Sequence, residues 1–74
     1  MIYFSKHALL KLRQRKISKN LVFATLRKPD YNGPSYGGRM AFFRKFGDLY
    51  FKVVCIKKGK VIIVVTQHWV RKIK

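Results

Sequence analysis

The chain has 74 residues, with eighteen Lys and Arg, two Asp and Glu, and a formal net charge of +16. Charge of this density repels itself in a compact state, and the usual partner that relieves the repulsion is a polyanion such as RNA or DNA. The two acids, Asp30 and Asp48, both lie in turn-like sequence. Their scarcity argues against a nuclease site built on metal ions held by carboxylates.

Composition also limits the fold class and the compartment. The chain is 49% hydrophobic and 15% aromatic, which is too apolar for a disordered basic tail. Its one cysteine, Cys55, allows no internal disulfide and suits a small buried hydrophobe better than a reactive thiol. No apolar run approaches the roughly 18 residues of a membrane helix, and the N-terminus does not resemble a signal peptide. We therefore expect one domain over residues 1–74, in the reducing cytoplasm and without a membrane partner.

Two helices are predicted first. Ser5 can cap a helix that continues to about Lys16, with Phe4 packing against Leu9 at its start.

Ser18 can cap a second helix over roughly Lys19 to Arg27, with Ile17 packing against Val22. Pro29 ends this helix, because the residue before a proline avoids the helical conformation.

The segment from Asp30 to Gly38 is rich in Pro and Gly and is predicted to be a loop. Its two tyrosines, Tyr31 and Tyr36, fit either of two roles, as anchors or as base-stacking groups.

Three strands follow, over Arg39 to Phe46, Leu49 to Ile56 and Val61 to His68, joined by two tight turns. The sequence also allows a short strand at Ile2 to Phe4. The basic tail from Val70 to Lys74 has no predicted structure. Because helices and strands are segregated, the fold class is α+β, with two N-terminal helices packed on a three- to four-stranded antiparallel meander.

The last predicted strand changes character along its length. Five β-branched residues, from Val61 to Val65, suit a strand that is covered on both faces. Simple alternation puts Thr66 and His68 on the same face as Ile62 and Val64. The polar end at Thr66 and His68 is either a site or a strand end that reaches water, with Trp69 closing the core.

A histidine with two cations marks the first predicted helix. His7, Lys11 and Arg15 repeat at helical spacing and form a polar stripe opposite Leu9 and Leu12. A histidine moves protons near neutral pH, and neighbouring cations lower its pKa and favour the neutral base. RNA cleavage needs such a base, together with charge stabilisation at the phosphate. The same stripe would equally suit phosphate binding without catalysis.

Further cations are candidate nucleic-acid ligands. Lys52 is the lone charge within the middle strand, and Arg44 interrupts the apolar face of the strand before it. Both suit phosphate binding, or else the protection of an edge strand against aggregation. Arg13 adds a cation on the first helix. Two histidines and one cysteine, far apart in sequence, do not match a zinc spacing, so no metal or cofactor is predicted.

Several short motifs resemble a known family. They are Ser5-Lys6-His7-Ala8, Arg13-Gln14-Arg15-Lys16-Ile17-Ser18, Lys28-Pro29-Asp30, and the strand Val61 to Thr66 that closes on threonine. Together they resemble small bacterial and archaeal domains that are similar to the RelE, ParE and BrnT toxins of toxin–antitoxin systems. The resemblance covers nearly the whole chain.

The resemblance implies a RelE-like fold and a metal-independent RNase toxin that acts on messenger RNA, often at the ribosome, and is held inactive by an acidic antitoxin. His7, Arg15 and Thr66 match motif positions. Lys11 stands where the family usually has arginine, which keeps the charge but loses the bidentate fork. His68, with Trp69, is similar to the His-Tyr ending of some of these toxins.

The sequence therefore predicts a metal-independent endoribonuclease toxin. His7 or His68 would transfer protons, helped by Arg15 and Thr66, while Lys11, Arg13, Arg44 and Lys52 would bind RNA. The alternative is a non-catalytic nucleic-acid-binding domain. A third class is an interaction protein whose charge serves only an acidic partner chain.

Overall fold

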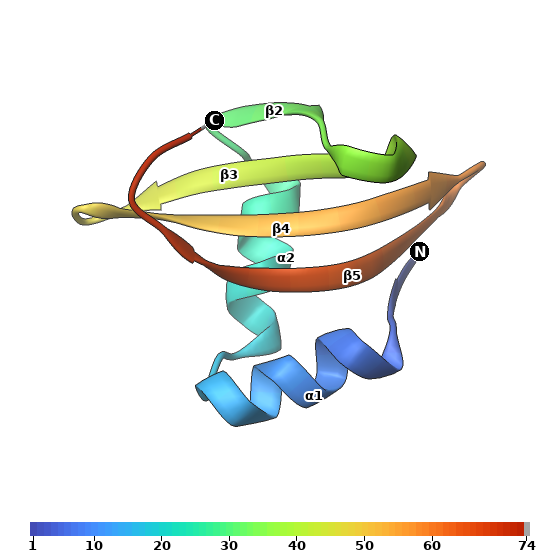
Figure 1. Cartoon of the computed structure of the whole chain (residues 1–74), viewed down its shortest axis with the longest axis horizontal. Coiled ribbons are helices and arrows are strands. Elements are labelled where there is room, and N and C mark those ends of the chain that lie inside the picture. Colours follow the sequence, from blue (N-terminus) through green and yellow to red (C-terminus); the bar gives the residue numbers. More distant parts are fainter. Residues whose placement is uncertain (74) are drawn as a thin grey trace.

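The computed structural model describes residues 1–73 and is an α+β domain, with two helices packed on one face of a five-stranded sheet (Figure 1). The chain runs through β1 (Ile2–Phe4), α1 (Lys6–Arg15), α2 (Lys19–Arg27), β2 (Tyr31–Pro34), a 3-10 turn (Tyr36–Gly38), β3 (Met40–Phe46), β4 (Leu49–Lys58) and β5 (Val61–Val70).

The sheet is larger than the predicted meander, and it is mixed. Its strand order is β1-β5-β4-β3-β2. Strands β2 to β5 are antiparallel neighbours, whereas β1 pairs in parallel with β5. The strand that the sequence allows at Ile2 to Phe4 is confirmed, but it runs parallel to β5. The prediction of three to four antiparallel strands is therefore wrong, because this edge is parallel and the segment after α2 adds a fifth strand at the other edge.

Both helices begin at the predicted caps. The hydroxyl oxygen of Ser5 accepts a hydrogen bond from the backbone N–H of Ala8, and that of Ser18 accepts one from Asn20, both at 3.0 Å. These oxygens satisfy N–H groups that have no partner within the first turn. Helix α2 has the predicted bounds. Helix α1 ends at Arg15, and Lys16 follows in the left-handed conformation as its C-cap.

The face that α1 presents to the sheet differs from the predicted one. Ala8 and Leu12 are buried, whereas Leu9 is 39% exposed, so Leu9 does not serve the predicted packing role. Residues four apart lie one above the other on a helix, so Ala8 and Leu12 make the contact stripe. Phe4 instead packs edge-on against Phe23 of α2, with ring centroids 5.8 Å apart.

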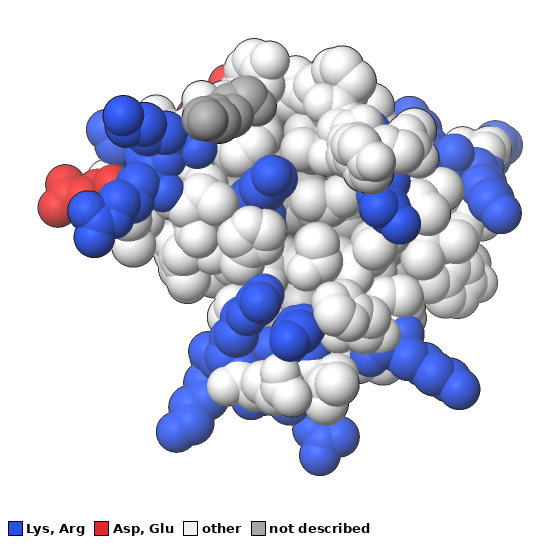
Figure 2. Space-filling view, viewed as in Figure 1, with Lys and Arg blue, Asp and Glu red and all other residues white. Residues whose placement is uncertain are grey.

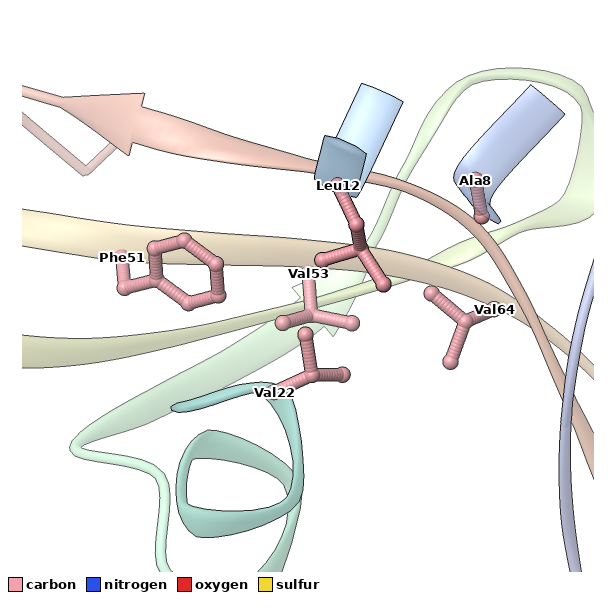
Figure 3. Close-up of a cluster of buried hydrophobic side chains, with 6 residues drawn as sticks. All are labelled: Ala8, Leu12, Val22, Phe51, Val53 and Val64. Atoms are coloured by element: carbon pink, nitrogen blue, oxygen red, sulfur yellow. The ribbon is translucent and has the colours of Figure 1, made fainter. Parts of the chain in front are cut away.

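The main core lies between the helices and the sheet. Figure 3 shows its buried members converging from both helices and from β4 and β5: Ala8, Leu12, Val22, Phe51, Val53 and Val64. Ile17, which is predicted to pack against Val22, is one of the partly buried side chains around this cluster.

Part of the predicted loop is a strand. Residues Tyr31 to Pro34 pair with β3 alone and form the outer edge of the sheet. An edge strand tolerates Pro34, which has no N–H to donate to a further neighbour. Pro and Gly made this segment look like a loop, and only pairing with β3 reveals the strand.

Two strands are also longer than predicted. β4 continues to Lys58 and β5 to Val70, beyond the predicted ends at Ile56 and His68. The added residues of β4 pair with residues of β5, and the added residues of β5 pair with residues of β4, so the two strands form one long hairpin.

A β-bulge changes which residues of β5 share a face. Cys55 pairs with Val64 and Val54 pairs with Thr66, so Val65 has no partner of its own. Since neighbours on β4 point to opposite faces, their partners Val64 and Thr66 do so too. The predicted common face for Val64 and Thr66 is therefore wrong. Val64 joins the helix-covered core, and the polar end of β5 turns to the other side.

That other side of the sheet is called here the open face, because no helix covers it. Figure 2 shows it, with uncharged side chains over much of its middle and Lys and Arg gathered over α1 and around the ends of the sheet. Ala41, Phe43 and Val54 are buried there, with Ile73 of the C-terminal tail packed against them. The predicted tail thus returns to the sheet as far as Ile73, and Lys74 lies outside the described residues.

Candidate nucleic-acid site on the open face

The site is centred on two side chains that lie directly opposite each other. Lys52 of β4 and His68 of β5 are register partners in the antiparallel pair. Direct partners point to the same face with their Cβ atoms about 4.5–5.5 Å apart. The bulge at Val65 is what brings His68 to the open face, beside Lys52.

Arg15 reaches this pair from the last turn of α1. Its Nη1 donates a 2.8 Å hydrogen bond to the backbone oxygen of Gln67, the residue before His68. β1 pairs with β5 only as far as Val64, so the edge of β5 beyond that point is free to receive Arg15. The bond holds the guanidinium beside His68.

The surroundings of His68 lower its pKa. Burial is the largest cause, because it disfavours the charged imidazolium, and the charges of Lys52 and Arg15 act in the same direction. His68 is therefore neutral near physiological pH and can accept a proton. The same two cations are what a phosphate needs beside that base.

Neither carboxylate lies in this arrangement. Asp30 accepts a 2.7 Å hydrogen bond from the backbone N–H of Lys45, and Asp48 lies in the turn between β3 and β4. Among residues 1–73 no three His, Cys, Asp or Glu side chains form a group that could hold a metal ion. Cys55 is buried, as predicted, and burial raises the pKa of its thiol.

Thr66 shares the open face with His68 and lies opposite Val54. The structure therefore brings together four of the predicted site residues, namely Arg15, Lys52, Thr66 and His68.

Arg44 lies elsewhere. It pairs with Phe51, a core residue, and so points to the helix-covered face. Its Nη1 donates a 3.1 Å hydrogen bond to the carbonyl oxygen of Ala24 in the last turn of α2, and its guanidinium lies over the ring of Phe46. Lys52 and Arg44 are both on interior strands of the sheet, so neither protects an edge.

The remaining candidates lie on α1. His7 is exposed in the first turn, about 12 Å along the helix axis from Arg15. The two histidines are therefore not joined in one site. Lys11 donates to the side chain of Gln14 at 3.3 Å, and Arg13 is exposed. These side chains form a basic helix surface next to the site.

Lys52 and His68 belong to a row of four side chains across the sheet, and the sequence did not predict the other two members. Tyr31, Phe43, Lys52 and His68 are successive register partners on β2, β3, β4 and β5. The sequence predicts Tyr31 as an anchor or a base-stacking group, but its place in the row depends on β2, which the sequence predicts as a loop.

A groove of about 220 Å³ lies on the helix-covered side of the sheet, away from His68. It is lined by Asn32, Met40, Phe42, Cys55, Lys57 and Ile62. A nucleic-acid backbone can be bound on an open surface, so the site at His68 does not require a closed pocket.

Within residues 1–73, neither helix has the length and apolar character that crossing a membrane would require. No family model, no curated protein and no solved structure matches the chain.

Proposed function

We propose that the chain binds RNA on the open face and cleaves it without a metal ion, with His68 as the proton-transfer group. One observation carries the proposal: a histidine with a lowered pKa has two cations, Lys52 and Arg15, as neighbours in a chain of net charge +16. A neutral base and two phosphate-binding cations are the parts that RNA cleavage through the ribose 2′-OH requires.

The proposed reaction starts with the transfer of the 2′-OH proton to a ring nitrogen of His68. The 2′ oxygen attacks the adjacent phosphorus, and the bond from phosphorus to the 5′ oxygen breaks. The leaving oxygen takes a proton from the imidazolium or from water, which leaves a 2′,3′-cyclic phosphate and a 5′-OH. Lys52 and Arg15 stabilise the negative charge that builds up on the phosphate oxygens, while Thr66 would hydrogen-bond a neighbouring RNA oxygen.

The resemblance to the RelE, ParE and BrnT toxins extends this proposal to a biological role. The chain would act as a toxin on messenger RNA, on the ribosome or free of it, and an acidic antitoxin would neutralise its charge. In this role Lys11, Arg13 and His7 would contact the RNA backbone along α1, outside the reaction centre. Arg44 would support α2 rather than bind RNA.

A non-catalytic RNA-binding domain is the second candidate, and one observation favours it. Only one of the two histidines lies in the cluster, because His7 is about 12 Å along α1 from Arg15. A second protein acid for the leaving oxygen is therefore missing among the described residues of the cluster. Such a domain would use the same cations for binding alone.

The test is a cleavage assay on single-stranded RNA in EDTA, with and without ribosomes, alongside expression in a host cell. We expect slower growth and RNA products that end in a cyclic phosphate. A substrate with a deoxyribose at the cleaved nucleotide should stay intact. Tight RNA binding without cleavage in either setting would favour the second candidate, and absence of RNA binding would leave only a protein-interaction role.

A further inference from the structure

The row across the open face continues beyond the two charged residues. Tyr31 pairs with Phe43, Phe43 with Lys52, and Lys52 with His68, so four neighbouring strands each contribute one side chain to the same line. Strands are about 4.8 Å apart, so the line from Tyr31 to His68 is about 14–15 Å long. This length matches a few nucleotides of an extended strand.

The two aromatic members have different exposures. Phe43 is 2% exposed and forms the floor of the row, with the Lys52 ammonium 5.6 Å from its ring centroid. Tyr31 is 47% exposed although its ring lies against Phe43, with centroids 5.9 Å apart. Ile73 of the C-terminal tail packs against the cluster that contains Phe43, whereas Tyr31 on the edge strand keeps an exposed aromatic surface that a ligand can contact.

The lack of a side chain at Gly33 leaves space for the Tyr31 ring to lie over the sheet. Gly33 is on the same face of β2, and a Cβ there would meet the hydroxyl oxygen of Tyr31 at 3.2 Å and its ring carbons at 3.5 Å. The ring therefore leans over the glycine, along the surface of the sheet.

We propose that Tyr31 stacks a nucleobase of a single-stranded RNA, and that this strand runs along the open face, past Ile73 of the C-terminal tail, to His68. The inference rests on the proposed RNA-binding function and adds a substrate class to it. Aromatic side chains stack on unpaired bases of any identity, whereas bases within a duplex have no free faces to offer. Lys52 and Arg15 then hold the phosphates at the far end of the row.

The test measures binding of a fluorescein-labelled, single-stranded 2′-O-methyl RNA, which cannot be cleaved because its 2′ oxygens are blocked. We expect Tyr31→Ala and Tyr31→Leu to weaken binding by about tenfold or more. Tyr31→Phe keeps the aromatic surface and should bind like the wild type. Leucine preserves the apolar contact with Phe43, so Tyr31→Leu separates stacking from folding.

Tyr36→Ala is the matched control, because Tyr36 is 88% exposed on the 3-10 turn outside the row. It should bind like the wild type. The salt dependence of binding should keep its slope in the Tyr31 variants, because no phosphate contact is lost. Wild-type binding by Tyr31→Leu, or an equal loss on a duplex of the same sequence, would overturn the inference.

The outcome also separates this inference from the proposed cleavage. If the wild type binds the blocked strand through Tyr31 but leaves ordinary RNA intact, base stacking is supported and the cleavage mechanism fails. If the wild type does not bind the single strand at low salt, base stacking and the RNA-binding function fail together.

Discussion

At the scale of single residues, the two histidines differ through their surroundings. His7 is exposed on the first turn of α1, whereas His68 is half-buried on the open face beside Lys52 and Arg15. Burial and two neighbouring positive charges all disfavour the imidazolium. The proposed base is therefore His68, while His7 belongs to the basic surface of the helix.

The pKa of His68 should respond to its neighbours. We expect an NMR titration to place it below the ordinary histidine value, and Lys52→Gln to raise it, because one repelling charge is removed. Cleavage that depends on neutral His68 should then persist below the pH at which an ordinary histidine becomes protonated. Lys57→Gln is the control, since Lys57 points to the other face of the sheet. A His68 pKa that does not move in Lys52→Gln would contradict this picture.

Arg15 and Arg13 form a matched pair on one helix. Both are exposed, but Arg15 donates a hydrogen bond to the backbone oxygen of Gln67, beside His68. We expect Arg15→Gln to slow RNA cleavage by far more than Arg13→Gln, which should lower RNA affinity only as the loss of one surface charge does. Single-turnover rates and binding constants measured side by side provide the comparison. Equal effects of the two changes on cleavage would argue against the placement of the site.

At the scale of helices and strands, the sequence was informative where local chemistry decides the structure. Ser5 and Ser18 are helix caps because a hydroxyl at that position satisfies a free N–H group. The edge strand at Tyr31 could not be predicted, because its Pro and Gly residues are tolerated only through pairing with β3. The bulge at Val65 could not be predicted from the sequence either, because it depends on the register between β5 and β4.

The candidate site was affected by the same limits. Residue type, helical spacing, strand alternation and the resemblance placed Arg15, Lys52, Thr66 and His68 among eight predicted site residues. They could not show that Arg44 faces the helices or that His7 lies apart, because both facts depend on the packing of α1 and α2 against the sheet. Tyr31 could be assigned to the row only from the pairing of β2 with β3.

Arg44 illustrates a cation with a structural role. Its bond to Ala24 lies at the C-terminal end of α2, where the helix dipole favours positive charge. We expect Arg44→Met to lower the free energy of unfolding by about 1–3 kcal/mol, measured in urea. Lys45→Met, at an exposed position of the same strand, should change it little. If the two variants are equally stable, the bond to Ala24 does not support α2.

At the scale of the whole molecule, charge and fold have separate roles. The main core between helices and sheet holds the domain together, and Lys and Arg gather over α1 and around the sheet (Figure 2). A net charge of +16 on 74 residues opposes compaction. A polyanion bound along the open face between Tyr31 and His68 would relieve that repulsion.

Salt should therefore act in opposite directions on folding and on binding. We expect the melting temperature of the free protein to rise with added sodium chloride, because screening weakens the repulsion between cations. RNA affinity should fall steeply over the same range, because each phosphate contact releases counterions. Thermal unfolding and fluorescence anisotropy across one salt series provide both readings. RNA binding that is insensitive to salt would favour a role in binding an acidic protein instead.

The most direct test of the central claim compares the two histidines in one assay. Single-turnover cleavage of a single-stranded RNA is measured in EDTA for the wild type, His68→Gln and His7→Gln. We predict that His68→Gln lowers the rate by about 10²–10⁴-fold, as expected for the loss of a proton-transfer group. His7→Gln should stay close to the wild type. Cleavage by His68→Gln at the wild-type rate would contradict the assignment of His68 as the reacting histidine.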